Sequence, residues 1–137
     1  MNSEFESFSK KTWLLVDDTS EVLSLMSALL SNLTDAKIEC FGSPADALAA
    51  FANAPGKYEL VITDYEMPGL DGLELCRLMK ALVPTQKILL ATGSGFFTEA
   101  AAQHVGFTGL LNKPFSIAKL LEALAGKNVE VAVPALA

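Results

Sequence analysis

The feature of this sequence that most constrains its fold is a fivefold alternation between short apolar runs and segments of helical periodicity. The runs are rich in aliphatic and β-branched residues and span residues 13–16, 37–41, 58–64, 87–92 and 109–112. Strands that alternate with helices pair in parallel through right-handed crossovers, and the helices cover both faces of the sheet. The pattern therefore predicts an α/β protein with a central five-stranded parallel sheet.

The segments between the runs carry apolar residues at three- and four-residue spacing, which is typical of amphipathic helices. The predicted inward-facing residues are Val22, Met26, Leu29, Leu30, Leu33, Leu48, Phe51, Leu75, Cys76, Met79, Leu82, Ile117, Leu120, Leu121 and Leu124. Ser43 followed by Pro44 predicts a capped helix start, and a short helix is expected over residues 98–104. The first, third and fourth runs are apolar on both faces and predict central strands, whereas the second alternates and predicts a position nearer an edge.

Length and composition indicate one domain. The 137 residues are 51% hydrophobic and 19% charged, which is enough apolar material for a substantial core. We expect a flexible N-terminus over residues 1–11, the domain over residues 12–126, and a tail over residues 127–137. The tail is interpreted as a disordered end or truncated linker, or alternatively as an edge-strand or dimer contact. The domain would stand alone or come from a larger protein.

Charge, apolar runs and cysteines exclude several classes of protein. Ten Lys and Arg residues against sixteen Asp and Glu residues give a net charge of -6, which disfavours direct nucleic-acid binding. The apolar runs are far shorter than the ~20 residues that span a bilayer, so no membrane association is expected. Cys40 and Cys76 are far apart and match neither a disulfide framework nor a zinc site, so both are predicted to be buried thiols in a cytoplasmic protein.

Polar side chains follow the predicted strands at the points where they end. Asp17 and Asp18 come after the first run, Asp64 closes the third, Thr92 closes the fourth and Lys113 follows the fifth. In open α/β sheets, ligands bind outside the carboxyl ends of the strands. Each acid alone is typical of a turn or helix cap, but three at one edge provide the hard oxygen ligands that Mg²⁺ prefers. Without a cation the three carboxylates would repel one another. The sequence thus favours a magnesium-binding acidic pocket.

The other two residues at this edge allow two interpretations each. The Lys113 ammonium could pair with Asp64 or with a phosphoryl oxygen, or it could be solvated. The Thr92 hydroxyl could donate to a nearby oxygen anion, or the residue could serve only as part of a strand.

Four motifs in this order and spacing resemble the receiver domain of two-component response regulators, across about residues 12–126. They are Leu15-Val16-Asp17-Asp18, Asp64 with Met67-Pro68-Gly69-Leu70-Asp71-Gly72, Ala91-Thr92-Gly93 and Lys113-Pro114-Phe115. The resemblance implies a flavodoxin-like, doubly wound (βα)5 fold. It also implies that Asp64 accepts a phosphoryl group from a phosphohistidine of a sensor histidine kinase or a histidine phosphotransfer protein.

The same resemblance assigns the remaining roles. Asp18 would bind Mg²⁺ directly and Asp17 directly or through water, while Asp64 would supply a side-chain oxygen and Glu66 its backbone carbonyl. Thr92 and Lys113 would contact the attached phosphoryl group. The domain would then catalyse only its own phosphorylation and dephosphorylation. It would signal to an unidentified downstream protein through a conformational change that involves Thr92 and Lys113 and spreads from the loop at residues 93–95 to the helix over residues 98–104, the fifth strand and the last helix.

One position departs from the pattern of the family. Many receivers carry Tyr or Phe three residues before the lysine of the Lys-Pro pair, where ring rotation accompanies the threonine shift, but this chain has Leu110. Phe107 lies nearby in the sequence and could substitute.

Phe96 and Phe97 are interpreted either as core residues or as an exposed hydrophobic contact.

Three other functions match parts of the sequence. An aspartyl-phosphate phosphatase would need an acid–base carboxylate two residues after its nucleophile, and Glu66 occupies that position. A flavin-binding module of the same fold class is disfavoured because Asp17 and Asp18 would repel its phosphate. The intact acidic set disfavours a receiver that signals by binding alone, whereas Leu110 in place of the usual aromatic residue favours it.

Overall fold

The computed structural model describes residues 11–93, 97–113 and 117–124. Its five strands are β1 Thr12–Val16, β2 Lys37–Phe41, β3 Tyr58–Asp64, β4 Ile88–Thr92 and β5 Gly109–Asn112. All neighbouring strands pair in parallel, in the order β2-β1-β3-β4-β5. This is the flavodoxin-like strand order of doubly wound sheets. The predicted fold class is confirmed, and β2 lies at the sheet edge as expected.

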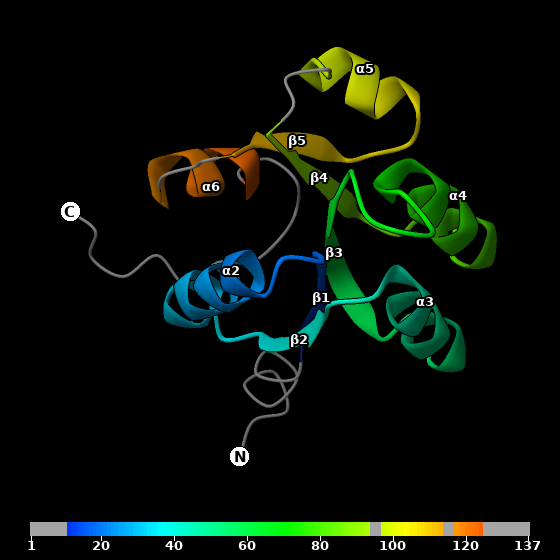
Figure 1. Cartoon of the computed structure of the whole chain (residues 1–137), viewed down its shortest axis with the longest axis horizontal. Helices are drawn as coiled ribbons and strands as arrows, with labels where there is room; N and C mark the ends of the chain where they lie inside the picture. Colours follow the sequence, from blue (N-terminus) through cyan, green and yellow to red (C-terminus); the bar gives the residue numbers. More distant parts are fainter. Residues whose placement is uncertain (1–10, 94–96, 114–116, 125–137) are drawn as a thin grey trace, which may run out of the picture.

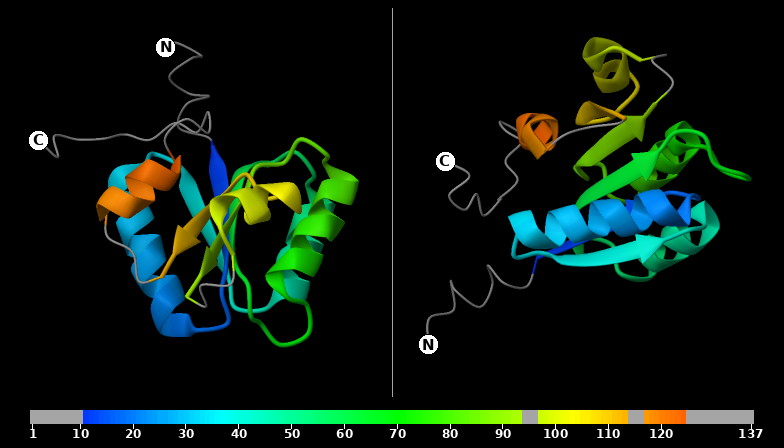
Figure 2. Two further views of the ribbon diagram at one scale, coloured as in Figure 1. Left: turned by 90° about the horizontal axis from the view of Figure 1, so that it is seen from above. Right: turned by 60° about the vertical axis from the view of Figure 1, so that its left-hand side comes forward.

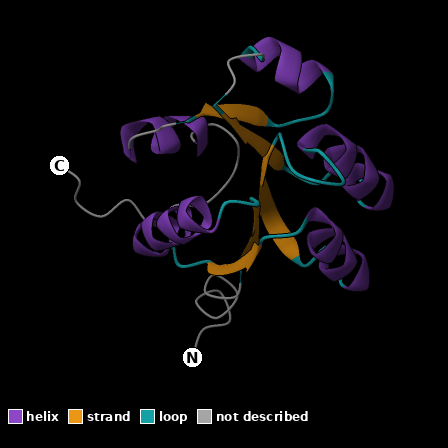
Figure 3. Ribbon diagram, viewed as in Figure 1, coloured by secondary structure: helices purple, strands orange, loops and turns teal. Residues whose placement is uncertain are grey.

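Four helices connect the strands and a fifth follows β5 in the described part of the chain. They are α2 Ser20–Leu33, α3 Pro44–Asn53, α4 Gly72–Leu82, α5 Glu99–His104 and α6 Ile117–Leu124. Helices α2 and α6 lie on one side of the sheet and α3 and α4 on the other, with α5 beside the edge strand β5 (Figures 1 and 3). Figure 2 shows the sheet between these layers from two further directions.

The core has two halves, one on each face of the sheet, because side chains alternate between the faces along a strand. In β1, Trp13 and Leu15 pack in the half that contains Met26 and Leu30 of α2. The intervening Leu14 and Val16 pack in the other half, which contains the buried residues of α3 and α4. All residues of β1 and β4 are buried, as predicted for central strands.

Two of the predicted core residues whose side chains the structure describes are exposed. Cys40 lies in the edge strand β2 and is exposed, whereas Cys76 in α4 is buried as predicted. Helix α2 covers Ile38 of β2 but not Cys40, which lies farther along the strand. Leu82 is 51% exposed because it is the last residue of α4, almost one turn beyond the buried Met79.

The predicted helix starts are present wherever the structure describes them. The Ser43 hydroxyl accepts a hydrogen bond from the Asp46 N–H, and Pro44 begins α3. Among the described residues, every helix is too short or too polar to cross a bilayer. The predictions for the N-terminus, the tail and Phe96 lie outside the described residues, and so do those for the apolar side chains of the last helix.

Candidate functional site

The carboxyl ends of β1 and β3 bring the three predicted acids together. Val16 at the end of β1 lies opposite Thr63 of β3, so the next residues along the chain, Asp17 and Asp64, are neighbours. One carboxylate oxygen from each of Asp17, Asp18 and Asp64 lies within 4.8 Å of the others. Asp17 is buried, Asp64 is half-buried and Asp18 is exposed, so the cluster opens to solvent on the side of Asp18.

Lys113 extends into this cluster from the end of β5. Its Nζ lies 2.7 Å from Asp17 Oδ2 and 3.2 Å from Asp64 Oδ1. The sequence suggested Asp64 as the partner of this lysine, but the shorter contact is made with the more buried Asp17. The Lys113 N–H also donates to the Thr92 carbonyl at 2.9 Å, which ties the two strand ends together.

Two backbone N–H groups orient the carboxylates of Asp17 and Asp64. The Thr19 N–H donates to Asp17 Oδ1 and the Tyr65 N–H donates to Asp64 Oδ1, each at 2.9 Å. Asp64 Oδ1 therefore receives both the Tyr65 N–H and the Lys113 ammonium, and Oδ2 is the Asp64 oxygen that takes no part in these two contacts.

The electrostatic environment opposes negative charge on Asp64 and favours positive charge on Lys113. Burial and the neighbouring Asp17 raise the pKa of Asp64, and the contacts with Lys113 and the Tyr65 N–H only partly offset this. Burial alone would lower the pKa of Lys113, but its contacts with Asp17 and Asp64 outweigh burial and the pKa is raised. The cluster therefore retains repulsion between carboxylates that a further cation would relieve.

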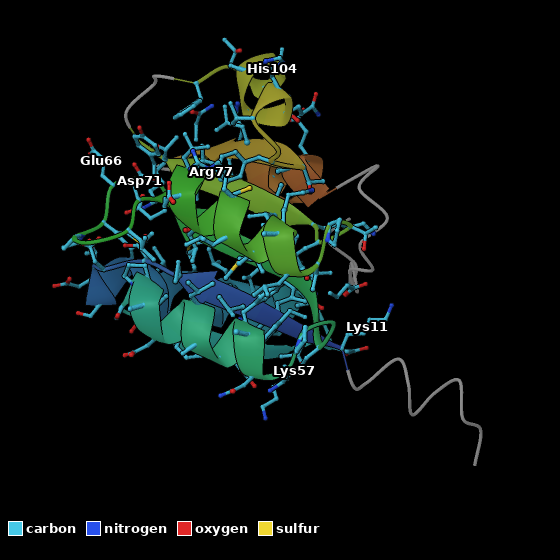
Figure 4. The ribbon with its side chains drawn as sticks, turned by 90° about the vertical axis from the view of Figure 1, so that its right-hand side faces the viewer. Lys11, Lys57, Glu66, Asp71, Arg77 and His104 are labelled. Atoms are coloured by element: carbon cyan, nitrogen blue, oxygen red, sulfur yellow. The ribbon has the colours of Figure 1, made fainter. Side chains whose placement is uncertain are left out.

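The donor set fits a magnesium ion. Three carboxylate oxygens in close proximity are hard ligands, and the exposed Asp18 leaves room for the waters that Mg²⁺ usually retains. Glu66 follows Asp64 by two residues on the loop between β3 and α4. Its side chain is exposed, at the same end of the molecule as Asp71 and opposite the end where Lys11 and Lys57 lie (Figure 4). The role of the Glu66 carbonyl as a ligand stays a prediction.

Thr92 is the last residue of β4 and is 2% exposed. The residue before it, Ala91, lies opposite Asp64 in the register of β3 and β4. Thr92 thus lies one position beyond Asp64 at the same end of the sheet. All six site residues predicted from the sequence come from strand ends, or from the loops that follow them, at this one edge. They are Asp17, Asp18, Asp64, Glu66, Thr92 and Lys113.

Sequence reasoning assigned no role to two residues that shape the site. The Gly72 N–H donates to the Tyr65 carbonyl at 2.8 Å, and this folds the loop between β3 and α4 back onto the end of β3. A Cβ atom at Gly72 would overlap the Asp64 carbonyl oxygen, so only glycine fits this close approach. The signal in the sequence is a glycine directly after Asp71, the residue that caps α4 by accepting the Glu74 N–H. No comparable signal identifies Tyr65.

Comparisons with known proteins agree with this geometry. The family model described as "Response regulator receiver domain" matches residues 13–125. Protein PilG of Pseudomonas aeruginosa is 32% identical over 118 residues, which cover 81% of this chain and 82% of PilG. A protein-glutamate methylesterase/protein-glutamine glutaminase of Xanthomonas oryzae is 35% identical over 120 residues, or 85% of this chain. The chain spans about a third (33%) of the length of that relative.

A solved receiver domain has the same fold. The response regulator receiver domain protein from Clostridium thermocellum superposes with a TM-score of 0.77 at 26% identity, covering 85% of this chain and 93% of that one. Receiver domains act in phosphorelay signalling in two-component systems and bind Mg²⁺ at an acidic pocket. The resemblance seen in the sequence is confirmed, and the chain belongs to the response regulator receiver domain family.

Proposed function

We propose that this domain accepts a phosphoryl group on Asp64 from a phosphohistidine and passes the signal on by a conformational change. The observation that carries the proposal is the convergence of Asp17, Asp18 and Asp64 with the ammonium of Lys113 at the carboxyl edge of the sheet. An isolated acid after a strand needs no such partners, whereas a phosphoacceptor needs neighbouring positive charge to stabilise the transferred group.

The geometry supports Asp64 as the nucleophile. Its Oδ2 takes no part in the contacts with Lys113 and the Tyr65 N–H, which leaves this oxygen available for in-line attack on phosphorus. A bond forms between that oxygen and phosphorus while the bond from phosphorus to the histidine nitrogen breaks, and the leaving imidazole keeps the electron pair. Catalysis of this kind is mostly positioning and electrostatic stabilisation. Lys113 would then face the transferred oxygens.

Asp17, Asp18, Asp64 and the Glu66 carbonyl would hold Mg²⁺, which supplies positive charge beside the phosphoryl oxygens when it is bound. In the phosphorylated domain Thr92 would donate its hydroxyl proton to a phosphoryl oxygen. Its position at the end of β4 supports this role, because the residues that follow it lead to α5. The product adds about 1.5 to 2 negative charges at the site, by analogy with other phosphorylated side chains.

The proposed phosphohistidine donor docks on α2. This helix begins two residues after Asp18, so its first turns border the site. Leu25 in α2 is 63% exposed, and it is one of two large hydrophobic side chains that stand out as exposed in the described part of the chain. Exposed apolar side chains beside a reactive site are suited to contact a partner protein. Replacing Leu25 with Asp should slow phosphotransfer from a histidine donor and leave phosphorylation by a small acyl phosphate unchanged.

Incubation with a small acyl phosphate and Mg²⁺, followed by intact mass measurement, tests the proposal. The native protein should gain a single phosphoryl group, and Asp64→Asn should gain none. Asp71→Asn is the matched control, because it makes the same change in the adjacent loop and Asn still caps α4. An unmodified native protein, or an adduct that persists in Asp64→Asn, would refute the assignment. Turnover of a small phosphomonoester would instead favour a phosphatase.

A further inference from the structure

We propose that an aromatic contact between Tyr65 and Phe97 couples Asp64 to helix α5, in place of the aromatic residue that many receivers carry on the last strand. The inference rests on the proposed function, because it names the route by which phosphorylation of Asp64 would reach α5. It is carried by a continuous series of contacts that leads from the Asp64 carboxylate to the backbone of Leu110.

The first contact joins Asp64 to Tyr65. The Tyr65 N–H donates to Asp64 Oδ1 at 2.9 Å, so the backbone of Tyr65 is bonded to the carboxylate that would be phosphorylated. A phosphoryl group on Asp64 changes the charge and the hydrogen bonding of this carboxylate. Tyr65 is therefore a direct neighbour that the modification must affect.

The second contact joins Tyr65 to Phe97. The two ring centroids are 5.1 Å apart and the ring planes meet at 74°, an edge-to-face arrangement. Both residues are half-buried and pack against the same half of the core. Aromatic pairs have preferred offset or edge-to-face geometries. A shift of the Tyr65 ring therefore changes the favoured position of the Phe97 ring, although the two residues are 32 positions apart in the sequence.

The third set of contacts joins Phe97 to α5 and β5. Phe97 precedes Thr98, whose hydroxyl caps α5 by accepting the Ala101 N–H at 3.0 Å. In the first turn of α5, Glu99 Oε1 accepts the Leu110 N–H of β5 at 3.2 Å. Movement of Phe97 thus acts on the capped start of α5, and through Glu99 on the edge strand.

The side chain of Leu110 is less suited to carry a conformational change from the site to α5. It is half-buried, and it lines a hollow of about 310 Å³ together with residues of α5, β5 and α6. An aliphatic side chain has no ring that could alternate between a buried and an exposed position. Phe107, the substitute considered from the sequence, is 3% exposed within the core. Tyr65 and Phe97 are the aromatic residues that link the end of β3 to the start of α5 among the described residues.

Amide chemical shifts measured with and without beryllofluoride and Mg²⁺, a mimic of the phosphoryl group, test this coupling. In the native protein the amides of residues 98–104 should shift. In Tyr65→Leu and in Phe97→Leu these shifts should fall to less than half, while the amides of Thr92 and Lys113 respond as in the native protein. Tyr65→Phe keeps the ring and should restore the response, and Leu110→Ala should leave it in place.

The outcomes separate this inference from the proposed function. A native protein that shows no shifts with the mimic would refute the proposed function and the inference with it. Native-like shifts over residues 98–104 in both leucine variants, with binding at the site intact, would refute the inference alone. Should Tyr65→Leu fail to fold, Phe97→Leu removes the same contact from its other side. Where both leucine variants fold, a double-mutant cycle on the shifts of residues 98–104 measures whether the rings act as a pair. If they do, adding the second leucine to the first reduces these shifts no further.

Discussion

Replacing Gly72 with Ala should disturb both the stability of the domain and the position of Asp64. Gly72 is the first residue of α4, and its N–H bonds to the Tyr65 carbonyl. A Cβ atom here would overlap the Asp64 carbonyl oxygen and lie 3.1 Å from Tyr65 Cα. These neighbours are backbone atoms, so no side chain can rotate away. The strand end that carries Asp64 has to move instead.

The expected magnitude follows from two opposing effects. Forcing an extra carbon into a closely packed site costs about 1–3 kcal/mol. Alanine has the better helix propensity, by up to about 1 kcal/mol in a helix interior and less at a first position. The net loss in the free energy of unfolding should therefore be about 1–2 kcal/mol. Displacing a reacting group by about 1 Å can slow a reaction about 100-fold, so phosphorylation of Asp64 should slow by about 10- to 100-fold.

Gly42→Ala is the matched control, since a Cβ atom at Gly42 would have no neighbour within 4 Å. Urea unfolding of the two variants compares their stability, and intact mass after timed incubation with an acyl phosphate and Mg²⁺ compares their phosphorylation rates. Equal stability and equal rates in the two variants would refute the claim that the close approach of Gly72 positions Asp64. Reduced stability with a native rate would refute only its connection to the reaction.

Two further predictions concern buried groups. Lys113→Met removes the cation that is 2.7 Å from the buried Asp17 carboxylate, and should lower the free energy of unfolding by about 2 kcal/mol because a hydrogen bond to a charged group is lost. Lys37→Met, at a lysine side chain that is 71% exposed, should lower it by less than about 0.5 kcal/mol, and equal losses in the two variants would contradict the argument. Burial raises the pKa of Cys76 from 9.0 to about 11, so its neutral thiol contributes stability that is complete below pH 9 and is lost as the pH rises through 11. Chemical unfolding at pH 8 to 11 should show that the free energy of unfolding of Cys76→Ala falls by about 2 kcal/mol less than that of the native protein over this range. An equal fall in the two proteins would show that the thiol does not ionise on unfolding.

The sequence alone was sufficient for the fold and for the edge at which the site lies. Hydrophobic periodicity is a local property, so the strands and helices could be located from neighbouring residues. The carboxyl ends of parallel strands share one edge of a sheet, and the sequence therefore predicts that the acids at the ends of β1 and β3 meet there. Even the edge position of β2 was visible in its alternation of apolar and polar residues.

Tertiary structure decided which groups touch, because such contacts depend on strand order and on packing between segments far apart in the sequence. Only the tertiary structure shows that Lys113 lies closer to Asp17 than to Asp64, and that α2 leaves Cys40 uncovered. The edge-to-face contact of Tyr65 and Phe97 likewise has no local signature. The residues around Tyr65 and those around Phe97 would look the same whether or not the two rings were in contact. The distance between the rings is set by the sheet that joins β3 to β4.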